Sequence, residues 1–257
     1  MSFKLLNGDC LKLMEAIPNY SIDLIFVDLP FGCLSCDWDI PIDLEKMWFE
    51  FMRIKKDNTP IFFTTTTKYG VNLINSAPKI CPYRYDVCYI TSASSGFLRS
   101  RHQPLRKHGL VYVFYEYQPL YDLSSHKHKF IRKGETNAQP KYNPPLPTSV
   151  YQGNPTKYHS YPQAKNNESI YTPPLPNSVL EIDSERSKHS TQKATELIRF
   201  FLKYYSKEGD VVLDNCMGSG STGVACIQMN RRFIGMELDK DIFKVAEERI
   251  NEETKLK

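Results

Sequence analysis

The 257-residue chain has a formal net charge of +4 at pH 7, and 41% of its residues are hydrophobic. It is long enough for one large domain, or for one domain with a sizeable insertion. Its seven scattered cysteines argue against a disulfide framework. No run approaches the ~18 apolar residues of a membrane span, and the start lacks a signal-peptide pattern. We therefore expect no membrane association and a cytoplasmic location, or a host-cell interior if the source is a phage or virus.

The first 117 residues alternate strand and helix patterns. Residues 22–27 form a continuous apolar run without polar alternation, which is typical of a strand covered on both faces. The lone CxxC formed by Cys33 and Cys36 has no second pair nearby, so we predict no metal site. We predict strands at 3–6, 22–27, 60–65, 85–90 and 110–115, and helices at 10–17, 44–54 and 68–75.

The composition changes in residues 118–188, which are rich in Pro, Asn, Ser, Tyr and Lys. This composition predicts a long, mostly irregular insertion, stiffened by proline. Residues 99–133 carry eight Lys or Arg against two acids, a local charge of +6 on an otherwise near-neutral chain. Such a basic segment favours a docking surface for a polyanion, although a solvated loop has the same composition.

Regular patterns return in the last part of the chain. Five apolar residues between Leu197 and Tyr205 fall on one helical face. Strands are predicted at 210–214 and 233–237, a helix at 222–229, and a last helix capped by Asp239. Alternating strands and helices predict a doubly wound α/β sheet. We expect segments 1–117 and 189–257 to form the two halves of one domain, with 118–188 inserted between them.

A glycine pattern joins the predicted strand at 210–214 to the next helix. Gly218, Gly220 and Gly223 satisfy GxGxxG, which lets a ligand approach the backbone at a helix N-terminus. The pattern alone also fits a dinucleotide site or a tight strand-to-helix turn. A P-loop is disfavoured because no lysine precedes Ser221 or Thr222.

Two acids narrow the choice of ligand. Asp214 ends the strand before the glycine loop, where a carboxylate would repel a pyrophosphate but attract an ammonium or sulfonium group. Glu237 ends the following strand, at a spacing that suits a ribose diol. Helix capping and solvation are the alternative roles for Glu237 and Asp239. S-adenosylmethionine has a ribose and a cationic end and lacks phosphate, so it is the predicted cofactor.

Two motifs together resemble the amino-group DNA methyltransferases. DLPFG at 28–32 resembles their (D/N/S)PP(Y/F) signature, and DNCMGSGSTGVAC at 214–226 resembles their cofactor loop. NGDC at 7–10, GFLRSRHQPLRKHGLVYVFY at 96–115 and SVLEIDSERSKHSTQKATEL at 178–197 resemble further family elements. The catalytic motif precedes the cofactor loop, which is the permuted order of the β class. The resemblance implies a mostly parallel, Rossmann-like methyltransferase sheet with an irregular target-recognition insertion.

The resemblance gives the DLPFG motif a chemical role. An exocyclic amino group is a poor nucleophile, and Asp28 with a backbone carbonyl of its turn would accept its two hydrogens. Pro30 would rigidify the turn, and Phe31 would stack on a base extruded from the duplex. Leu29 stands where the family has its first proline, and we expect activity to survive this change. Asp28, Pro30 and Phe31 are thus the predicted catalytic residues.

The resemblance also implies a cofactor-binding set. Asp9 would lie near the adenine amino group of the cofactor, and capping of the helix at 10–17 is an equally weighted role for it. The methionine part would be bound by Asp214, Gly218, Ser219 and Gly220, and the ribose by Glu237. His189, Thr191 and Lys193 would close the pocket around the cofactor carboxylate.

The basic stretch would contact phosphates of double-stranded DNA. A homodimer and a cognate restriction endonuclease are further partners that the family allows. An initial Asp in the tetrad favours N6 of adenine over N4 of cytosine by family habit. An RNA or small-molecule methyltransferase, an inactive DNA-binding subunit and an NAD-type oxidoreductase are the rival functions. The predicted DNA-binding residues are Arg99, Arg101, Arg106, Lys107, Lys127, Lys129, Arg132 and Lys133.

Overall fold

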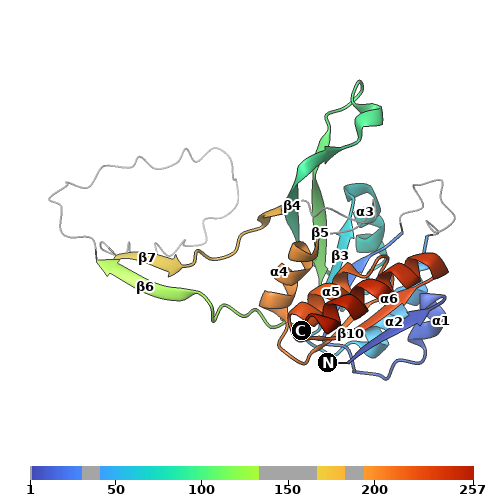
Figure 1. Cartoon of the computed structure of the whole chain (residues 1–257). Helices are drawn as coiled ribbons and strands as arrows, with labels where there is room; N and C mark the ends of the chain where they lie inside the picture. Colours follow the sequence, from blue (N-terminus) through green and yellow to red (C-terminus); the bar gives the residue numbers. More distant parts are fainter. Residues whose placement is uncertain (1, 31–40, 133–166, 183–193) are drawn as a thin grey trace. The chain divides into compact units, whose positions relative to one another are not determined.

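The computed structural model of the chain describes residues 2–30, 41–132, 167–182 and 194–257 (Figure 1). The chain divides into two compact units. The first comprises residues 1–122 and 177–257, and the second comprises residues 123–176. Within the described ranges, every helix is too short or too polar to cross a bilayer.

The first unit is built on an eight-stranded sheet with the order β1-β10-β9-β2-β3-β5-β4-β8. β1, β10, β9, β2 and β3 are parallel to one another, whereas β5 is antiparallel to both of its neighbours. The predicted doubly wound, mostly parallel sheet is therefore confirmed. Its strands are β1 (Phe3–Asn7), β2 (Leu24–Asp28), β3 (Ile61–Thr65), β4 (Tyr83–Ser95), β5 (Arg106–Phe114), β8 (Val179–Ile182), β9 (Val211–Asp214) and β10 (Arg232–Glu237).

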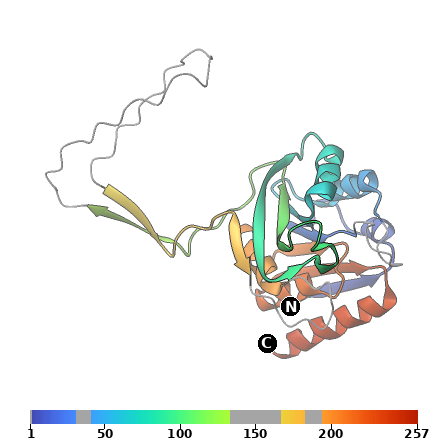
Figure 2. The same cartoon turned by 90° about the horizontal axis from the view of Figure 1, so that it is seen from above.

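Helices cover both faces of this sheet. Successive residues of β2 alternate between two apolar cores, because side chains along a strand point to opposite faces. Ile25 and Val27 pack in one core with Trp48, whereas Leu24 and Phe26 pack in the other. In Figure 2 the red α6 lies on one side of the sheet and the teal α3 on the other. The helices are α1 (Cys10–Met14), α2 (Leu44–Ile54), α3 (Thr67–Ser76), α4 (Thr195–Tyr205), α5 (Ser221–Gln228) and α6 (Lys240–Lys255).

Side-chain caps fix the starts of two helices at the predicted residues. Asp43 accepts hydrogen bonds from the backbone N–H groups of Glu45 and Lys46, and α2 then runs over the predicted residues 44–54. Asp239 caps α6 in the same way, as its sequence position predicted. An acid at a helix N-terminus also interacts favourably with the helix dipole.

Three strands fall within the stretch that was predicted to be mostly irregular. β6 (Lys127–Arg132) pairs with β7 (Asn167–Thr172) in the second unit. β8 pairs in parallel with β4 and so belongs to the main sheet of the first unit. All three strands are short, β6 and β7 are mostly polar, and pairing with a distant partner stabilises them. Composition alone therefore gave no sign of them. Residues 133–166 and 183–188 of the same stretch lie outside the described residues.

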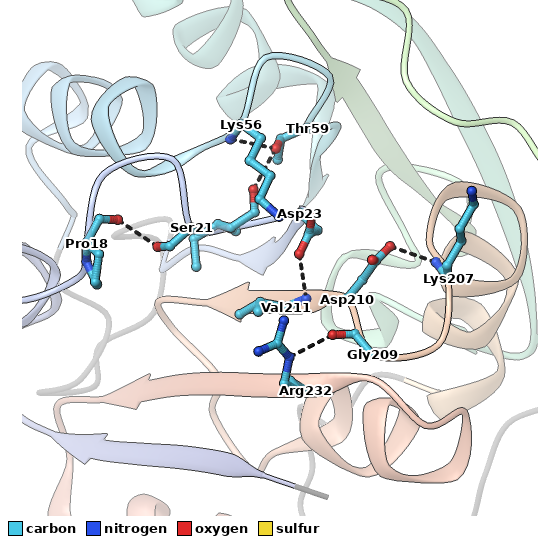
Figure 3. Close-up of polar contacts among 11 residues, drawn as sticks. Pro18, Ser21, Asp23, Lys56, Thr59, Lys207, Gly209, Asp210, Val211 and Arg232 are labelled. Carbon is cyan, nitrogen blue, oxygen red and sulfur yellow. Dashed lines mark hydrogen bonds and ion pairs between the residues drawn. The ribbon is translucent and has the colours of Figure 1, made fainter.

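Asp23 joins the amino-terminal ends of β2 and β9, and Asp210 fixes the turn before β9 (Figure 3). Asp23 accepts a hydrogen bond of 2.9 Å from the backbone N–H of Val211, and its other oxygen pairs with Lys56 Nζ at 2.6 Å. Asp210 accepts a hydrogen bond of 2.7 Å from the backbone N–H of Lys207. These contacts fix the register of neighbouring strands, and so help to determine what the opposite edge of the sheet presents.

Candidate active site

Three of the predicted site acids end neighbouring parallel strands. β2 ends at Asp28, β9 at Asp214 and β10 at Glu237, and these three strands are adjacent in the sheet. Parallel strands have their carboxyl ends at one edge, which is where open α/β sheets bind ligands. Burial is the main cause that raises the pKa of Asp214, and the negative charges of Asp28 and Glu237 add to it. The sheet thus gathers the three carboxylates into one electrostatic site.

Asp28 is oriented by the neighbouring strand. The sheet register places Asp28 opposite Thr64 of β3, and the buried Thr64 hydroxyl donates a hydrogen bond to Asp28 Oδ1. Leu29 is only 3% exposed and packs in the core, which explains how an apolar residue replaces the usual proline. Pro30 is half-buried beside it. The predicted stacking residue, Phe31, lies outside the described residues.

Asp214 is a buried carboxylate held by uncharged donors. Its side chain is 3% exposed and accepts hydrogen bonds from the Thr222 hydroxyl at 2.6 Å and from the backbone N–H of Cys216 at 3.1 Å. Burial raises the pKa of Asp214 to about 7, and the two hydrogen bonds offset part of this effect. The group is therefore close to its titration point at neutral pH, and a cationic ligand would favour its ionised form.

The glycine loop lies between β9 and α5, and two of its glycines have left-handed backbone conformations. Gly218 has φ +52° and Gly220 has φ +81°, in the left-handed region where a side chain is disfavoured. α5 then begins at Ser221. The buried oxygens Ser221 Oγ and Asn215 Oδ1 have no hydrogen-bond partner within the described part of the chain. Buried polar atoms are normally paired, so this loop has unused capacity for a polar ligand.

Glu237 and Ser219 are engaged within the site. The Glu237 carboxylate accepts hydrogen bonds from the backbone N–H groups of Gly218 at 3.0 Å and Asp239 at 2.9 Å. Burial raises the pKa of Glu237 above its usual value. The Ser219 hydroxyl accepts a hydrogen bond of 3.0 Å from Arg249 of α6. Glu237 therefore connects the end of β10 to the glycine loop, and Arg249 fixes the other side of that loop.

Asp9 caps α1, as the alternative role predicted. Its carboxylate is exposed and accepts a hydrogen bond of 3.0 Å from the backbone N–H of Leu11. The next residue, Cys10, accepts a contact of 3.5 Å from the Asn215 side-chain amide. The start of α1 thus lies against the loop that follows β9, although a cofactor contact by Asp9 itself stays a prediction.

Sequence reasoning missed the two threonines that orient the acids. Thr64 opens a run of four threonines at the end of β3, and Thr222 lies in the glycine motif itself. The available signal was a threonine near the end of β3, beside Asp28, and another in the first turn of α5, after Asp214. Only pairing across the sheet and across the loop shows which carboxylate each hydroxyl contacts.

The remaining predicted residues are divided along the chain. His189, Thr191, Lys193 and Lys133 lie outside the described residues. The predicted DNA-binding residues are shared between the two units. Arg99, Arg101, Arg106 and Lys107 belong to the β4–β5 region of the first unit, and Lys127, Lys129 and Arg132 belong to β6 of the second.

Known proteins show sequence similarity over different lengths. The Type II methyltransferase M2.DpnII of Streptococcus pneumoniae is 38% identical over 73 residues, which are 28% of this chain and 27% of that protein. The match therefore spans about a quarter of that relative's length. The DNA adenine methyltransferase YhdJ of Escherichia coli (strain K12) is 24% identical over 96% of this chain and 82% of its own.

Solved structures share the fold over nearly the full length. The M1.HpyAVI–SAM complex has a TM-score of 0.61 at 16% identity, over 97% of this chain and 100% of its own. PvuII DNA methyltransferase (cytosine-N4-specific) has a TM-score of 0.61 at 14% identity, over 99% of this chain and 92% of its own. The family model described as DNA methylase (N6_N4_Mtase) matches residues 22–248, a range that contains both Asp28 and the glycine loop. Because this match covers most of the chain, the protein belongs to that family of DNA methylases.

Proposed function

We propose that this protein is a site-specific DNA methyltransferase that methylates N6 of adenine in a base flipped out of the duplex. The observation that carries the proposal is the position of Asp28, at the end of β2 and one strand away from Asp214 and its glycine loop. An acid at this position suits an amino-group acceptor. The adenine assignment is supported by the initial Asp of the tetrad and by the name of YhdJ, a relative matched over 96% of this chain.

S-adenosylmethionine is the proposed cofactor, and the described residues fit it. The open backbone at Gly218 leaves room for close approach, because a Cβ there would meet nothing within 4 Å. Asp214 supplies a negative charge for a cationic group, and Glu237 an acceptor for a ribose diol. The unpaired Ser221 Oγ and Asn215 Oδ1 add polar contacts. When bound, the cofactor supplies an electrophilic methyl group on a sulfonium.

Asp28 prepares the acceptor amino group. The lone pair of an exocyclic amino group is conjugated into its ring, so the group must be oriented before it reacts. The Asp28 carboxylate accepts one amino hydrogen, and a backbone carbonyl of the following turn accepts the other. The Thr64 hydroxyl fixes the carboxylate, and Pro30 limits movement of the turn. Phe31 provides a face on which the extruded base stacks.

The basic residues of the second unit provide a phosphate-binding surface in this proposal. Lys127 and Lys129 are exposed on β6. Changing Lys127, Lys129, Arg132 and Lys133 to Ala should flatten the log–log salt dependence of DNA binding, because each phosphate contact contributes about 0.9 to the slope. Fluorescence anisotropy between 50 and 300 mM salt measures the slope. Four lysines elsewhere, Lys203, Lys240, Lys244 and Lys255, provide the matched control quadruple variant. Equal slopes for the two variants would place the DNA on another surface.

One experiment tests substrate, cofactor and base together. Purified protein is incubated with unmethylated genomic DNA and S-adenosylmethionine carrying a tritiated methyl group. The DNA is then digested, and the labelled nucleoside is identified by mass spectrometry. Label in N6-methyldeoxyadenosine supports the proposal. Label in N4-methyldeoxycytidine keeps the mechanism but overturns the base. If the protein binds the cofactor but leaves the DNA unlabelled, the incubation is repeated with RNA. Label in RNA then supports an RNA enzyme, and no label in either nucleic acid supports an inactive subunit. The Type II name of M2.DpnII supports a search for a cognate restriction endonuclease.

A further inference from the structure

The β4–β5 hairpin extends beyond the edge of the sheet that carries the site. The register places Thr65, the last residue of β3, beside Leu110 of β5, and Leu110 beside Cys88 of β4. β4 then continues for seven residues, to Ser95, in the direction in which β3 ends. At ~3.3 Å per residue, these seven residues span roughly 20 Å. Figure 1 shows the hairpin continuing past the other strands of the first unit. The tip of the hairpin therefore projects from the same edge as Asp28.

Hydrogen bonds hold this hairpin together. The register pairs Ser95 with Arg106, and the Ser95 hydroxyl donates to the Arg106 carbonyl at 3.4 Å. The Arg106 side chain donates to the His108 carbonyl at 2.9 Å. Gly96 then reverses the chain with φ +87°, a conformation that favours glycine. The tip is thus presented on an ordered support.

Large apolar side chains are exposed at the tip. Phe97 and Leu98 follow Gly96 directly, and their exposed fractions are 66% and 103%. Leu105, on the returning strand side, is 39% exposed. One exposed apolar side chain is ordinary, but consecutive exposed Phe and Leu at the end of a projecting hairpin form a small apolar surface. Such exposed apolar surface marks a binding site for a partner.

The charged residues around Phe97 and Leu98 indicate which kind of partner this surface fits. The chain has no Asp or Glu between Asp86 and Glu116, whereas this interval contains Arg99, Arg101, Arg106 and Lys107. A small apolar surface in a segment whose only Asp, Glu, Lys or Arg residues are cationic complements a polyanion with an apolar interior. Duplex DNA has this combination, because its phosphates surround stacked bases. DNA-bending proteins insert Phe or Leu side chains between base steps in the same way.

We propose that Leu98, supported by Phe97, is a wedge that enters the base stack of duplex DNA next to the target base. The proposal rests on the proposed function. The cationic residues of the tip bind the flanking phosphates, and Leu98 occupies the gap that the extruded base leaves. The duplex is thereby kept open while Asp28 engages the amino group. Leu98 is a positioning residue in this role, since it does not contact the reacting atoms.

The test compares two duplexes that contain the site mapped by sequencing of genomic DNA methylated in vitro. In one, the target base is paired, and in the other it lies opposite an abasic position, so that it is already unpaired. Leu98→Ala should lower kcat/KM about 10-fold on the paired duplex and less than ~3-fold on the abasic duplex, because extrusion is easier there. Leu98→Met, which keeps an apolar side chain of similar size, should restore activity on the paired duplex.

The control is Leu256→Ala, which removes another exposed leucine (83% exposed) at the end of α6. Its activity should equal that of the unchanged protein on both duplexes. An equal loss for Leu98→Ala on both duplexes, or no loss on either, overturns the wedge. Dissociation of an oligomer by Leu98→Ala with unchanged kcat/KM would assign the tip to protein contacts and also overturns it. Absence of methylation at any site of the genomic DNA, in the step that maps the site, refutes the proposed function itself.

Discussion

The two edges of the parallel sheet use the same residue type in opposite ways. An aspartate immediately precedes each of β2 and β9, and another aspartate ends each strand. At the amino-terminal edge, Asp23 pairs with the Lys56 ammonium and with a backbone N–H of β9. At the carboxyl edge, Asp28 and Asp214 accept hydrogen bonds from threonine hydroxyls instead.

The fold neutralises the charge of Asp23 at the amino edge and, within the described residues, leaves the charge of Asp214 without a lysine partner of this kind. A lysine partner at the amino edge offsets the charge of Asp23 and fixes strand register (Figure 3). The hydroxyl and the backbone N–H that contact Asp214 orient its carboxylate but leave its charge in place, and in a buried position that charge costs free energy. The raised pKa of Asp214 reports this cost. The Asp214 carboxylate is thereby suited to bind a cation.

The largest expected effect is on catalysis at the carboxyl edge. Asp28→Ala should lower kcat by roughly 10³-fold, because the amino group of the base loses its acceptor. The affinity for S-adenosylmethionine should change less than about 3-fold, since Asp28 belongs to the base site. Single-turnover methylation and calorimetric titration measure the two quantities. Loss of cofactor affinity with intact kcat would show that the two sites are misassigned.

Asp214→Asn should make the folded protein more stable and should weaken its binding of S-adenosylmethionine. The folded protein keeps the Asp214 proton up to about pH 7, whereas an unfolded chain releases it near 3.8. Stability from this group is therefore present below pH 3.8 and is lost as pH rises through 7. The asparagine variant should be more stable than the unchanged protein by ~2–4 kcal/mol at pH 8, and this gain should vanish near pH 4.

The same variant should bind S-adenosylmethionine about 10-fold more weakly at pH 8, because the cationic end loses its carboxylate. In the unchanged protein, affinity should fall as pH decreases below 7, and in the variant it should not. Denaturant unfolding and calorimetry over this pH range measure both effects. A variant that is less stable at pH 8 would contradict the raised pKa.

At the amino edge, Asp23→Ala should affect stability alone. It removes the ion pair with Lys56 and leaves the Val211 N–H without its acceptor, which should lower the free energy of unfolding by about 2 kcal/mol. Urea denaturation measures this change. The kcat of the folded variant should equal that of the unchanged protein. A fall in kcat comparable to that of Asp28→Ala would erase the distinction between the edges.

The smallest effect is expected at the support of Asp28. Thr64→Val keeps the shape of the side chain but removes the hydroxyl that fixes the carboxylate, so kcat should fall about 10-fold. Thr64→Ser retains the hydroxyl and should restore most of the activity. If serine lowers kcat and valine does not, packing of the methyl group, and not the hydrogen bond, is what Thr64 contributes.

The parts of the molecule that depend on local patterns could be predicted from the amino-acid sequence. The apolar run before Asp28 predicted a strand buried on both faces, and β2 places its residues alternately in two cores. The capping residue Asp239 and the glycines of the loop were also readable, because helix starts and left-handed turns favour particular residue types. The ends of α2 followed from such local signals alone.

Contacts between residues that lie far apart in the sequence could be identified only from the tertiary structure. β8 is a strand because β4 offers it an edge, and the β4–β5 hairpin is longer than predicted because cross-strand pairing replaces the missing apolar pattern. The hydroxyl partners of Asp28 and Asp214 come from other elements, so no local window of sequence contains the contact to Asp28. The hydrophobic periodicity of the sequence indicates which residues are buried. The pKa of a buried acid depends instead on neighbouring groups that the sheet brings together from distant parts of the chain.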